Sequence, residues 1–380
     1  MLLGVRIQNF DCFSDHQVGL LLEESIGFVG SKERGIRLRN LNAIIGRNNT
    51  GKSSFIKSMS FIKRCILDDV AKASTEDNRP GFMNLIIDKD KPSIFTLFFK
   101  LKDVGPGSLY LEYKLTVGAS KFGSPYVKDE TVLLSKRKEN EVTTEVILHN
   151  YPEKRLVNDE RITALSVLGR LKNDAPNELN LLYDEIDKWF FCQFSTYDTP
   201  DYYALGNAPG GHKHLNSAGS NLGNVLTYLK SLDNNEYDRI VSEINSRIPV
   251  MRIKSTMPES LEGSPEKLFK YLLLLRDKEP KSTIFIETPD KDLYHDMVDV
   301  LAIEMRQFTL DHRYSQIIFS THNPYIVESM PPKEIWVFGR DIKTDEINIK
   351  CAGSNPVVSE LFNEGVGMGA IWYGGHLDED

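Results

Sequence analysis

The sequence has few cysteines and no long apolar segment. Its four cysteines (Cys12, Cys65, Cys192 and Cys351) lack the spacing of metal ligands or of a disulfide framework, which indicates buried thiols in a reducing compartment. No apolar run approaches the roughly 20 residues that a membrane-spanning helix needs, and the N-terminus lacks the apolar stretch of a signal peptide. We therefore expect a cytoplasmic protein that does not enter the membrane.

The sequence also lacks an excess of positive charge and any internal repeat. With a net charge of -8, the 380-residue chain does not have the basic character of a dedicated nucleic-acid binder, although a local basic face remains open. Hydrophobic residues make up 41% and charged residues 26%, which is typical of a globular protein with two or three structural units.

The segment from Gly46 to Ser53, GRNNTGKS, matches the phosphate-binding pattern G-x-x-x-x-G-K-[ST]. Its glycines let successive backbone N–H groups point at phosphates, while Lys52 supplies a positive charge and the Ser53 hydroxyl can ligate Mg²⁺. An apolar strand is expected over residues 41–45, and a helix from about 53 to 66 directs its N-terminal dipole at the same anion. The sequence thus predicts that a nucleoside triphosphate binds here with Mg²⁺.

Two more apolar runs end abruptly in polar residues. TIFI, residues 283–286, leads into Glu287, and a helical pattern follows it. QIIFS, residues 316–320, leads into Thr321 and His322. Because ligands bind at the carboxyl edge of parallel sheets, we expect these side chains near the phosphate loop.

This order of motifs resembles the ABC-type ATPase heads, and more narrowly the AAA-family ATPases with an AAA_21/OLD-like domain, which are related to the RecF and SMC heads. Residues 5–20, 215–232 and 259–275 resemble the opening strand-turn-strand, a pre-helical Gly/Asn segment and the signature segment of that family. Residues 67–210 match only in general layout. The resemblance implies an α/β P-loop NTPase fold with a mostly parallel core sheet, an antiparallel β-subdomain and a helical insertion.

The resemblance also implies roles for individual residues. Glu287 takes the Walker B position beside Mg²⁺, and His322 matches the switch histidine that approaches the γ-phosphate. Ser260 and Gly263 of the signature segment would contact the nucleotide of a partner head. The expected phosphate cradle comprises Gly46, Arg47, Asn48, Asn49, Thr50, Gly51, Lys52, Ser53 and Ser54.

Two departures from the family pattern predict a slow ATPase. Where these heads normally have a water-polarising glutamate, this chain has Thr288, and Asp290 is the substitute that we consider. The signature segment has Leu261 where its serine is normal, although Ser260 or Ser264 could replace it. Loss of one such catalytic group commonly costs roughly two to four orders of magnitude in rate.

The remaining segments suggest five regions along the chain. Alternating patterns between residues 93 and 150 predict an antiparallel sheet, and short helical patterns cover 160–172 and 177–188. These helices are too short for the coiled coil of SMC proteins. His212 and His214 lie in a Gly/Asn-rich stretch that we interpret as a mobile loop rather than a metal site, because no carboxylate or cysteine accompanies them at local ligand spacing. We predict an N-terminal core part (1–66), a β-subdomain (67–150), an insertion ending in the signature (151–265), a C-terminal core part (266–350) and a tail ending in a solvated acidic stretch (351–380).

The expected function is that of a stand-alone ATPase head without a nuclease domain. ATP held between two heads would form a homodimer or higher homo-oligomer that controls a separate nuclease or toxin, and such heads resemble components of bacterial anti-phage defence. One alternative is a RecF-like ATP-dependent clamp that binds DNA. The other is a conventional ATP hydrolase that drives remodelling.

Overall fold

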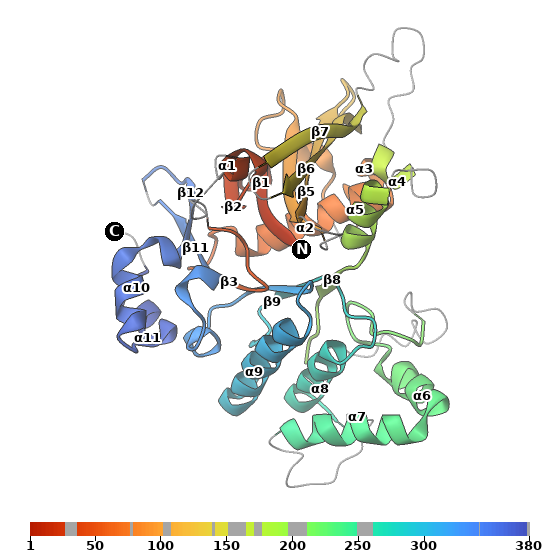
Figure 1. The fold of residues 1–380 in the computed structure, drawn as a ribbon, viewed down its shortest axis with the longest axis vertical. Helices are drawn as coiled ribbons and strands as arrows, with labels where there is room; N and C mark the ends of the chain where they lie inside the picture. The colour runs from red at the N-terminus through yellow and green to blue at the C-terminus, as the bar shows by residue number, and fades with distance from the viewer. Residues whose placement is uncertain are drawn as a thin grey trace.

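The computed structural model describes residues 1–26, 36–76, 79–101, 108–138, 141–150, 165–170, 177–196, 211–248, 261–341 and 343–377. Two six-stranded sheets form the framework, and helix α2 (Lys52–Leu67) packs between them (Figure 1). No helix within the described ranges is both long and apolar enough to cross a membrane.

The first sheet is antiparallel, with the strand order β2-β1-β4-β5-β6-β7. The strands predicted between residues 93 and 150 are confirmed. The first two strands of the chain also join this sheet, since Val5 of β1 pairs with Leu97 of β4. The boundary predicted after residue 66 therefore assigns β1 and β2 to a different region from the other strands of their sheet. The partner of a strand cannot be predicted from the residues of that strand alone. The strands are β1 (Leu2–Phe10), β2 (Phe13–Gly19), β4 (Ser93–Lys100), β5 (Ser108–Ala119), β6 (Pro125–Lys138) and β7 (Glu141–Asn150).

The second sheet has the order β12-β11-β3-β10-β9-β8, and all its neighbouring strands are parallel except β11 and β12. Strands β3 and β10 are fully buried, as expected for near-continuous apolar runs covered on both faces. This is the mostly parallel core sheet that the sequence predicts. Its strands are β3 (Leu41–Ile45), β8 (Trp189–Cys192), β9 (Thr283–Glu287), β10 (Gln316–Ser320), β11 (Ile335–Arg340) and β12 (Ile347–Cys351).

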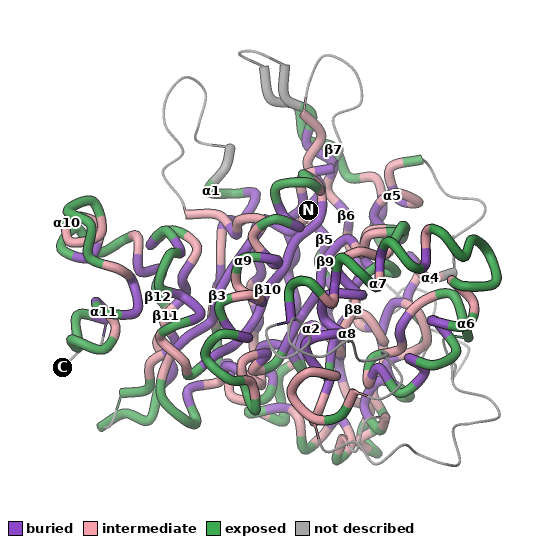
Figure 2. The backbone as a smooth tube through the Cα atoms, turned by 90° about the horizontal axis from the view of Figure 1, so that it is seen from below, coloured by how far each residue is buried: buried purple, intermediate pink, exposed green. Residues whose placement is uncertain are grey.

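Side chains alternate between two cores across the parallel sheet. Ile44, Phe285 and Ile318 face α2 and the antiparallel sheet, whereas Ala43 and Phe319 face the opposite helices. Figures 1 and 2 show this layering, with the buried strands at the centre. On the α2 side lie α3 (Val70–Ala73), α4 (Val167–Arg170) and α5 (Asn177–Asp187); on the other side lie α6 (Leu222–Leu232), α7 (Asn234–Arg247), α8 (Ser264–Leu275) and α9 (His295–Asp311).

Several short elements complete the fold. The helix expected over residues 177–188 is present as α5, whereas of 160–172 only 165–170 are described, and they contain α4. The C-terminal region contributes buried side chains such as Val358, Met368 and Leu377, so it packs on the core up to the last described residue. The other short elements are α1 (Leu22–Ile26), η1 (Phe82–Asn84), η5 (Pro324–Val327), η6 (Pro332–Glu334), η7 (Ala352–Ser354), α10 (Pro356–Asn363) and α11 (Met368–Tyr373).

Candidate functional site

The candidate site lies where β3, β10 and β9 end at the carboxyl edge of the parallel sheet. Ser320 pairs in register with both Ile44 and Glu287, so the three strand ends are level. Beyond these pairs, the Thr321 N–H donates to Ile44 O over 3.0 Å, and the Thr288 N–H donates to Ser320 O over 3.0 Å. This edge of the sheet therefore brings together the start of the phosphate loop, Glu287 and His322, as the sequence predicts.

The phosphate loop depends on glycines at its two ends. Gly46 has φ 142° and Gly51 has φ 93°, and Asn49 between them also has a positive φ of 61°. A Cβ atom at Gly46 would lie 2.0 Å from the carbonyl oxygen of Phe338, which no side chain can tolerate. The loop therefore curls tightly from β3 into α2, as a backbone cradle for phosphate requires.

Lys52 is buried within this loop, with an exposed fraction of 5%. Its Nζ donates to Gly46 O over 2.9 Å and to Arg47 O over 2.5 Å. Burial lowers the pKa of Lys52 to about 8, and the negative charge of Glu287 acts in the opposite direction. A desolvated ammonium thus sits where the sequence expects a charge for the phosphates.

Two oxygen ligands meet beside the loop. The Ser53 hydroxyl, at the start of α2, donates to Glu287 Oε1 at the end of β9. Hydroxyl and carboxylate oxygens are hard ligands of the kind that Mg²⁺ prefers. Ser53 and Glu287 are 234 positions apart in the sequence and are predicted to hold Mg²⁺ together. Their side chains are in direct contact.

Thr288 and Asp290, the two residues considered above in connection with the catalytic glutamate, differ in their surroundings. Thr288 has φ 44°, a left-handed conformation that β-branched residues rarely adopt. Asp290 Oδ1 accepts from the Thr321 hydroxyl over 2.7 Å, and burial raises the pKa of this carboxyl group. Asp290 is thus directed towards the residue that precedes His322.

His322 is exposed and follows the fully buried Thr321. Its pKa is lowered by partial burial and by the positive charge of Lys52, while Asp290 raises it. These effects favour the neutral imidazole near neutral pH. A neutral ring can accept or donate a hydrogen bond near the phosphate loop without adding a second charge beside Lys52.

The described part of the predicted signature segment contacts the loop that follows β9. Ser260 lies outside the described residues, whereas Gly263 has φ 65° and directly precedes α8. The Ser264 hydroxyl donates to Asp292 O, and Lys267 Nζ donates to Lys291 O over 2.6 Å. These hydrogen bonds within one chain therefore hold the start of α8 next to the loop that contains Asp290.

Sequence reasoning missed β8 and the residue that follows it. Cys192 of β8 pairs with Ile286, so the exposed Gln193 stands beside Glu287 at the carboxyl edge. An amide oxygen there is a further polar group within the site. The signal in the sequence was the apolar run WFFC before Gln193, which is short enough to be interpreted as part of a helix-rich insertion.

The two histidines of the Gly/Asn-rich stretch make separate contacts. The His212 ring lies against Tyr228, with centroids 4.5 Å apart, and His214 Nδ1 lies 2.7 Å from Asp277 Oδ2. Asn221 ties the described part of this loop together through bonds to Gly211 O and His214 O. Over the described residues, no group of three or more His, Cys, Asp or Glu side chains could hold a metal ion.

Comparison with known proteins identifies the family of the chain. The family model described as "AAA domain, putative AbiEii toxin, Type IV TA system" matches residues 41–328. No curated protein matches the sequence.

Solved structures with a similar arrangement include three SMC heads. The SMC head domain from Thermotoga maritima has a TM-score of 0.41 and 12% identity, covering 92% of this chain and 98% of that chain. The SmcHead bound to the C-winged helix domain of ScpA has a TM-score of 0.45 and 11% identity, covering 93% and 99%. An Smc head domain with an extended coiled coil, bound to the C-terminal domain of ScpA derived from Pyrococcus furiosus, has a TM-score of 0.39 and 12% identity, covering 95% and 99%.

Proposed function

Because the chain belongs to the AAA-domain family described as "putative AbiEii toxin, Type IV TA system", we propose that residues 46–54, Glu287 and His322 form its ATP site. Membership of this family makes the chain an ATP-binding ATPase of the ABC type. The observation that supports the assignment of residues best is the contact between Ser53 and Glu287 beside the buried Lys52. Three strands and one helix bring together a charge for phosphate and two ligands for a divalent cation.

Each group in the site has a distinct task in this proposal. The N–H groups of residues 46–54 hold the phosphates, and Lys52 neutralises part of their charge. Ser53 and Glu287 would hold Mg²⁺, which would neutralise part of the phosphate charge. His322 binds the γ-phosphate by a hydrogen bond, and Asp290 orients the backbone before it through Thr321. Gly263 and the neighbouring Ser260 contact the nucleotide of a second head.

Replacing Lys52 with Ala tests the ATP site directly. We expect Lys52→Ala to abolish ATP binding measured by calorimetry, since the phosphates lose their fixed counter-charge. Lys57→Ala is the matched control, because Lys57 is an exposed lysine of the same helix, outside the loop. Normal ATP affinity in Lys52→Ala would show that the site is elsewhere.

We further propose that this ATPase is a nucleotide-dependent switch for a separate effector protein, such as a nuclease or toxin. The description of the family refers to a toxin and a type IV toxin–antitoxin system, which supports a role in bacterial defence against phage. The test is to purify the chain together with the products of neighbouring genes, with and without ATP. A partner that co-elutes only in one nucleotide state is expected, and a chain that binds none in either state contradicts the proposal.

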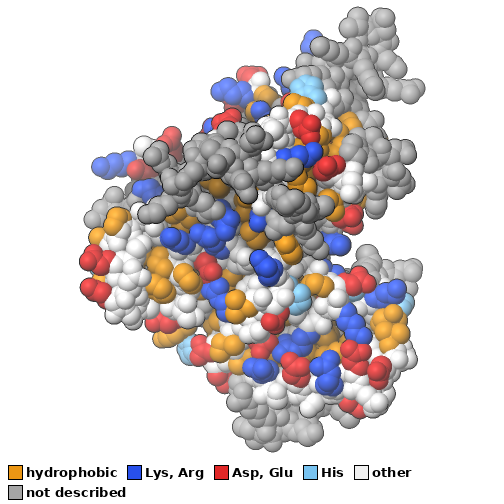
Figure 3. Space-filling model, viewed as in Figure 1, with side chains coloured by type: hydrophobic (Ala, Val, Ile, Leu, Met, Phe, Trp, Pro, Cys, Tyr) orange, Lys and Arg blue, Asp and Glu red, His pale blue; other side chains and the backbone are white. Residues whose placement is uncertain are grey.

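A DNA-binding clamp is the competing function, and the charge distribution gives it less support. On the face shown in Figure 3, Lys and Arg side chains are interspersed with Asp and Glu over the described residues. The net charge of -8 also opposes general attraction to DNA. DNA binding that falls steeply with added salt would favour the clamp, and absence of binding at low salt would exclude it.

A further inference from the structure

A small cavity lies away from the ATP site, between the C-terminal half of α2 and the free edge of β8. Its volume is about 290 Å³, close to the lower limit of roughly 300 Å³ for ligand pockets. Strand β8 is the last strand of its sheet, so one side of it has no neighbouring strand among the described residues. The lining includes Lys63, Arg64 and Asp68 from α2 and its end, Phe190 and Phe191 from β8, and Ser217.

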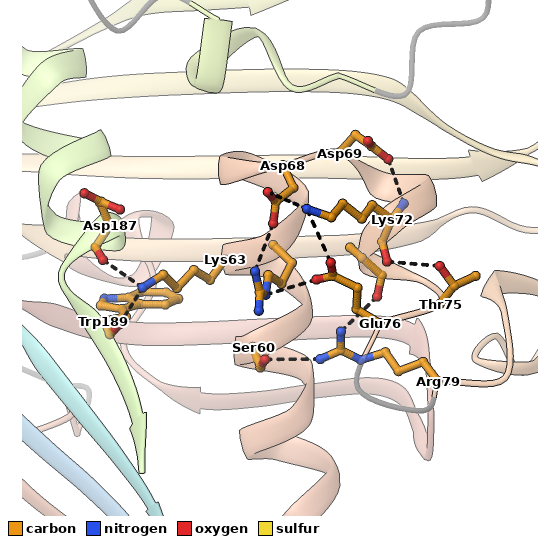
Figure 4. Close-up of polar contacts among 12 residues, drawn as sticks. Ser60, Lys63, Asp68, Asp69, Lys72, Thr75, Glu76, Arg79, Asp187 and Trp189 are labelled. Atoms are coloured by element: carbon orange, nitrogen blue, oxygen red, sulfur yellow. Dashed lines mark hydrogen bonds and ion pairs between the residues drawn. The ribbon is translucent and has the colours of Figure 1, made fainter. Parts of the chain in front are cut away.

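Lys63 brings a positive charge to this cavity, and Asp187 is the carboxylate that acts on this charge without forming an ion pair with it. Its Nζ donates to Asp187 O over 2.7 Å and to Trp189 O over 2.6 Å (Figure 4). Among the described residues, it forms no ion pair, and one of its three N–H groups has no partner. Burial lowers the pKa of Lys63 to about 8, and the charges of Arg64 and Lys281 act in the same direction against that of Asp187. A negatively charged hydrogen-bond acceptor would accept from the remaining N–H group of Lys63 and stabilise its positive charge.

The other charges at the end of α2 neutralise one another. Asp68 pairs with Arg64 over 3.1 Å and with Lys72 over 3.2 Å. Glu76 pairs with the same two cations, over 3.4 Å and 3.3 Å (Figure 4). Two positive and two negative charges thus form a closed network, which leaves Lys63 as the cation available to a ligand.

The free edge of β8 offers both a donor and an acceptor beside Lys63. The Gln193 N–H donates to Ser217 O over 2.8 Å, and Trp189 O accepts from Lys63, so alternate residues direct their backbone groups to this edge. Phe191 lies between them, so the same alternation directs its N–H and C=O to this edge, and neither group bonds to a described residue outside the strands. Its ring is stacked on Phe285 with centroids 4.7 Å apart, which holds this part of the edge in place.

We propose that this cavity binds an extended segment of a partner protein, with an acidic side chain on Lys63 and its backbone paired with Phe191. A small anion would satisfy Lys63 alone, whereas a peptide group satisfies both the N–H and the C=O of Phe191. The proposal deepens the proposed function, because it gives the switch a surface for its effector, and it rests on that function for the nature of the partner. Phe191 is the residue of this edge whose backbone the partner would pair with. The acidic side chain therefore supplies much of the specificity.

Fluorescence anisotropy with a labelled peptide, Thr-Val-Thr-Glu-Thr-Val-Thr, tests this proposal. We expect Lys63→Glu to weaken its binding by about tenfold or more, since attraction becomes repulsion. A peptide with Lys in place of the central Glu should bind the Lys63→Glu variant better than it binds the wild type. Lys57→Glu is the control, because this change alters the same helix by the same charge outside the cavity.

The outcomes separate this proposal from the ATP site. Without added nucleotide, Lys52→Ala should bind the peptide as the wild type does, and Lys63→Glu should bind ATP as the wild type does. Equal peptide binding by the wild type and Lys63→Glu, or no binding by the wild type, overturns the proposal. Competition by free glutamate as strong as by the peptide also overturns it, in favour of a small-anion site. If Lys63→Glu does not fold, Lys63→Met is measured instead and should show the same loss for the Glu peptide.

Discussion

At the scale of single residues, Thr288 has a backbone conformation that is unusual for threonine, at a position where the family resemblance predicts glutamate. Its φ of 44° costs a β-branched residue on the order of 1–3 kcal/mol, and this strain lies next to Glu287. The backbone is held there by the bond from its N–H to Ser320 O. Thr288, which the family resemblance predicts at the position of the catalytic carboxylate, is therefore held in a fixed backbone conformation.

We predict that Thr288→Glu raises the rate of ATP hydrolysis several-fold or more. The wild type should turn over well below about one ATP per second, because Thr288 cannot accept a proton at neutral pH. Glutamate restores a carboxylate and also removes the branched Cβ from the left-handed conformation. The measurement is phosphate release at saturating ATP and Mg²⁺, with Asp290→Asn as the comparison. Fast wild-type hydrolysis that disappears in Asp290→Asn would identify Asp290 as the base.

Lys52 leads to a prediction about pH. Burial lowers its pKa to about 8, below the 10.5 of an exposed lysine, and bound phosphates would raise the pKa again. Near pH 8.5, ATP binding should therefore take up protons, and affinity should fall as pH rises above about 8. Calorimetry in buffers of different ionisation enthalpy measures this uptake. At pH 7, where Lys52 is already charged, the uptake should be much smaller; equal uptake at both values would assign it to another group.

Residue-level prediction from the sequence depended on whether the determinants were local. The phosphate loop was predictable, since Gly46, Lys52 and Ser53 form one continuous pattern between a strand and a helix. The bond from Thr321 to Asp290 and the conformation of Thr288 arise from the pairing of β9 with β10, which the sequence of either strand alone does not specify.

At the scale of elements, one buried carboxylate joins the antiparallel sheet to the helical insertion. Glu130 of β6 is fully buried and accepts from the Tyr113 hydroxyl over 2.9 Å and the Ser166 hydroxyl over 2.7 Å. It also accepts from the backbone N–H of Val167 over 2.6 Å and of Leu168 over 3.2 Å, at the first turn of α4. Four donors depend on this one side chain.

Glu130→Ala should lower the free energy of unfolding by about 3 kcal/mol or more. The substitution leaves a cavity and removes the acceptor from several buried donors, each of which costs roughly 1–3 kcal/mol when it is unsatisfied. Urea denaturation followed by circular dichroism measures the change. Glu145→Ala is the control, because the exposed pair of Glu145 with Lys136 should contribute less than about 1 kcal/mol. Similar losses in the two variants would contradict the anchoring role of Glu130.

Long elements with regular periodicity were predictable, and short ones were not. The strands between residues 93 and 150 and the helix after the phosphate loop extend over enough residues to show a period. Strand β8 has four residues, and its membership of the sheet follows from its packing against β9. The place of β1 and β2 in the antiparallel sheet is likewise set by pairing with β4.

At the scale of the whole molecule, we propose that one chain contains half of each nucleotide site. The start of α8 contacts its own chain at Lys291 and Asp292, and Gly263 precedes this contact. The signature segment would then act on the ATP of a second copy.

ATP with Mg²⁺ should therefore promote a dimer or a larger homo-oligomer. Size-exclusion chromatography with light scattering, with and without ATP-Mg²⁺, measures the mass in solution. Lys52→Ala should remain in the nucleotide-free state, whereas Lys57→Ala should behave as the wild type. A strict monomer in both conditions would refute the shared site.

The position of β3 also affects how the chain is made. Both strand neighbours of β3, β10 and β11, are encoded near the end of the chain, and Ser53 meets Glu287 from 234 residues away. At roughly 5–20 residues per second, a ribosome needs on the order of ten to fifty seconds to synthesise that interval. During this time the apolar β3 has no partner strand on either side, and the ATP site does not yet exist. Nucleotide bound between Ser53 and Glu287 therefore cannot stabilise the nascent chain before β9 has emerged.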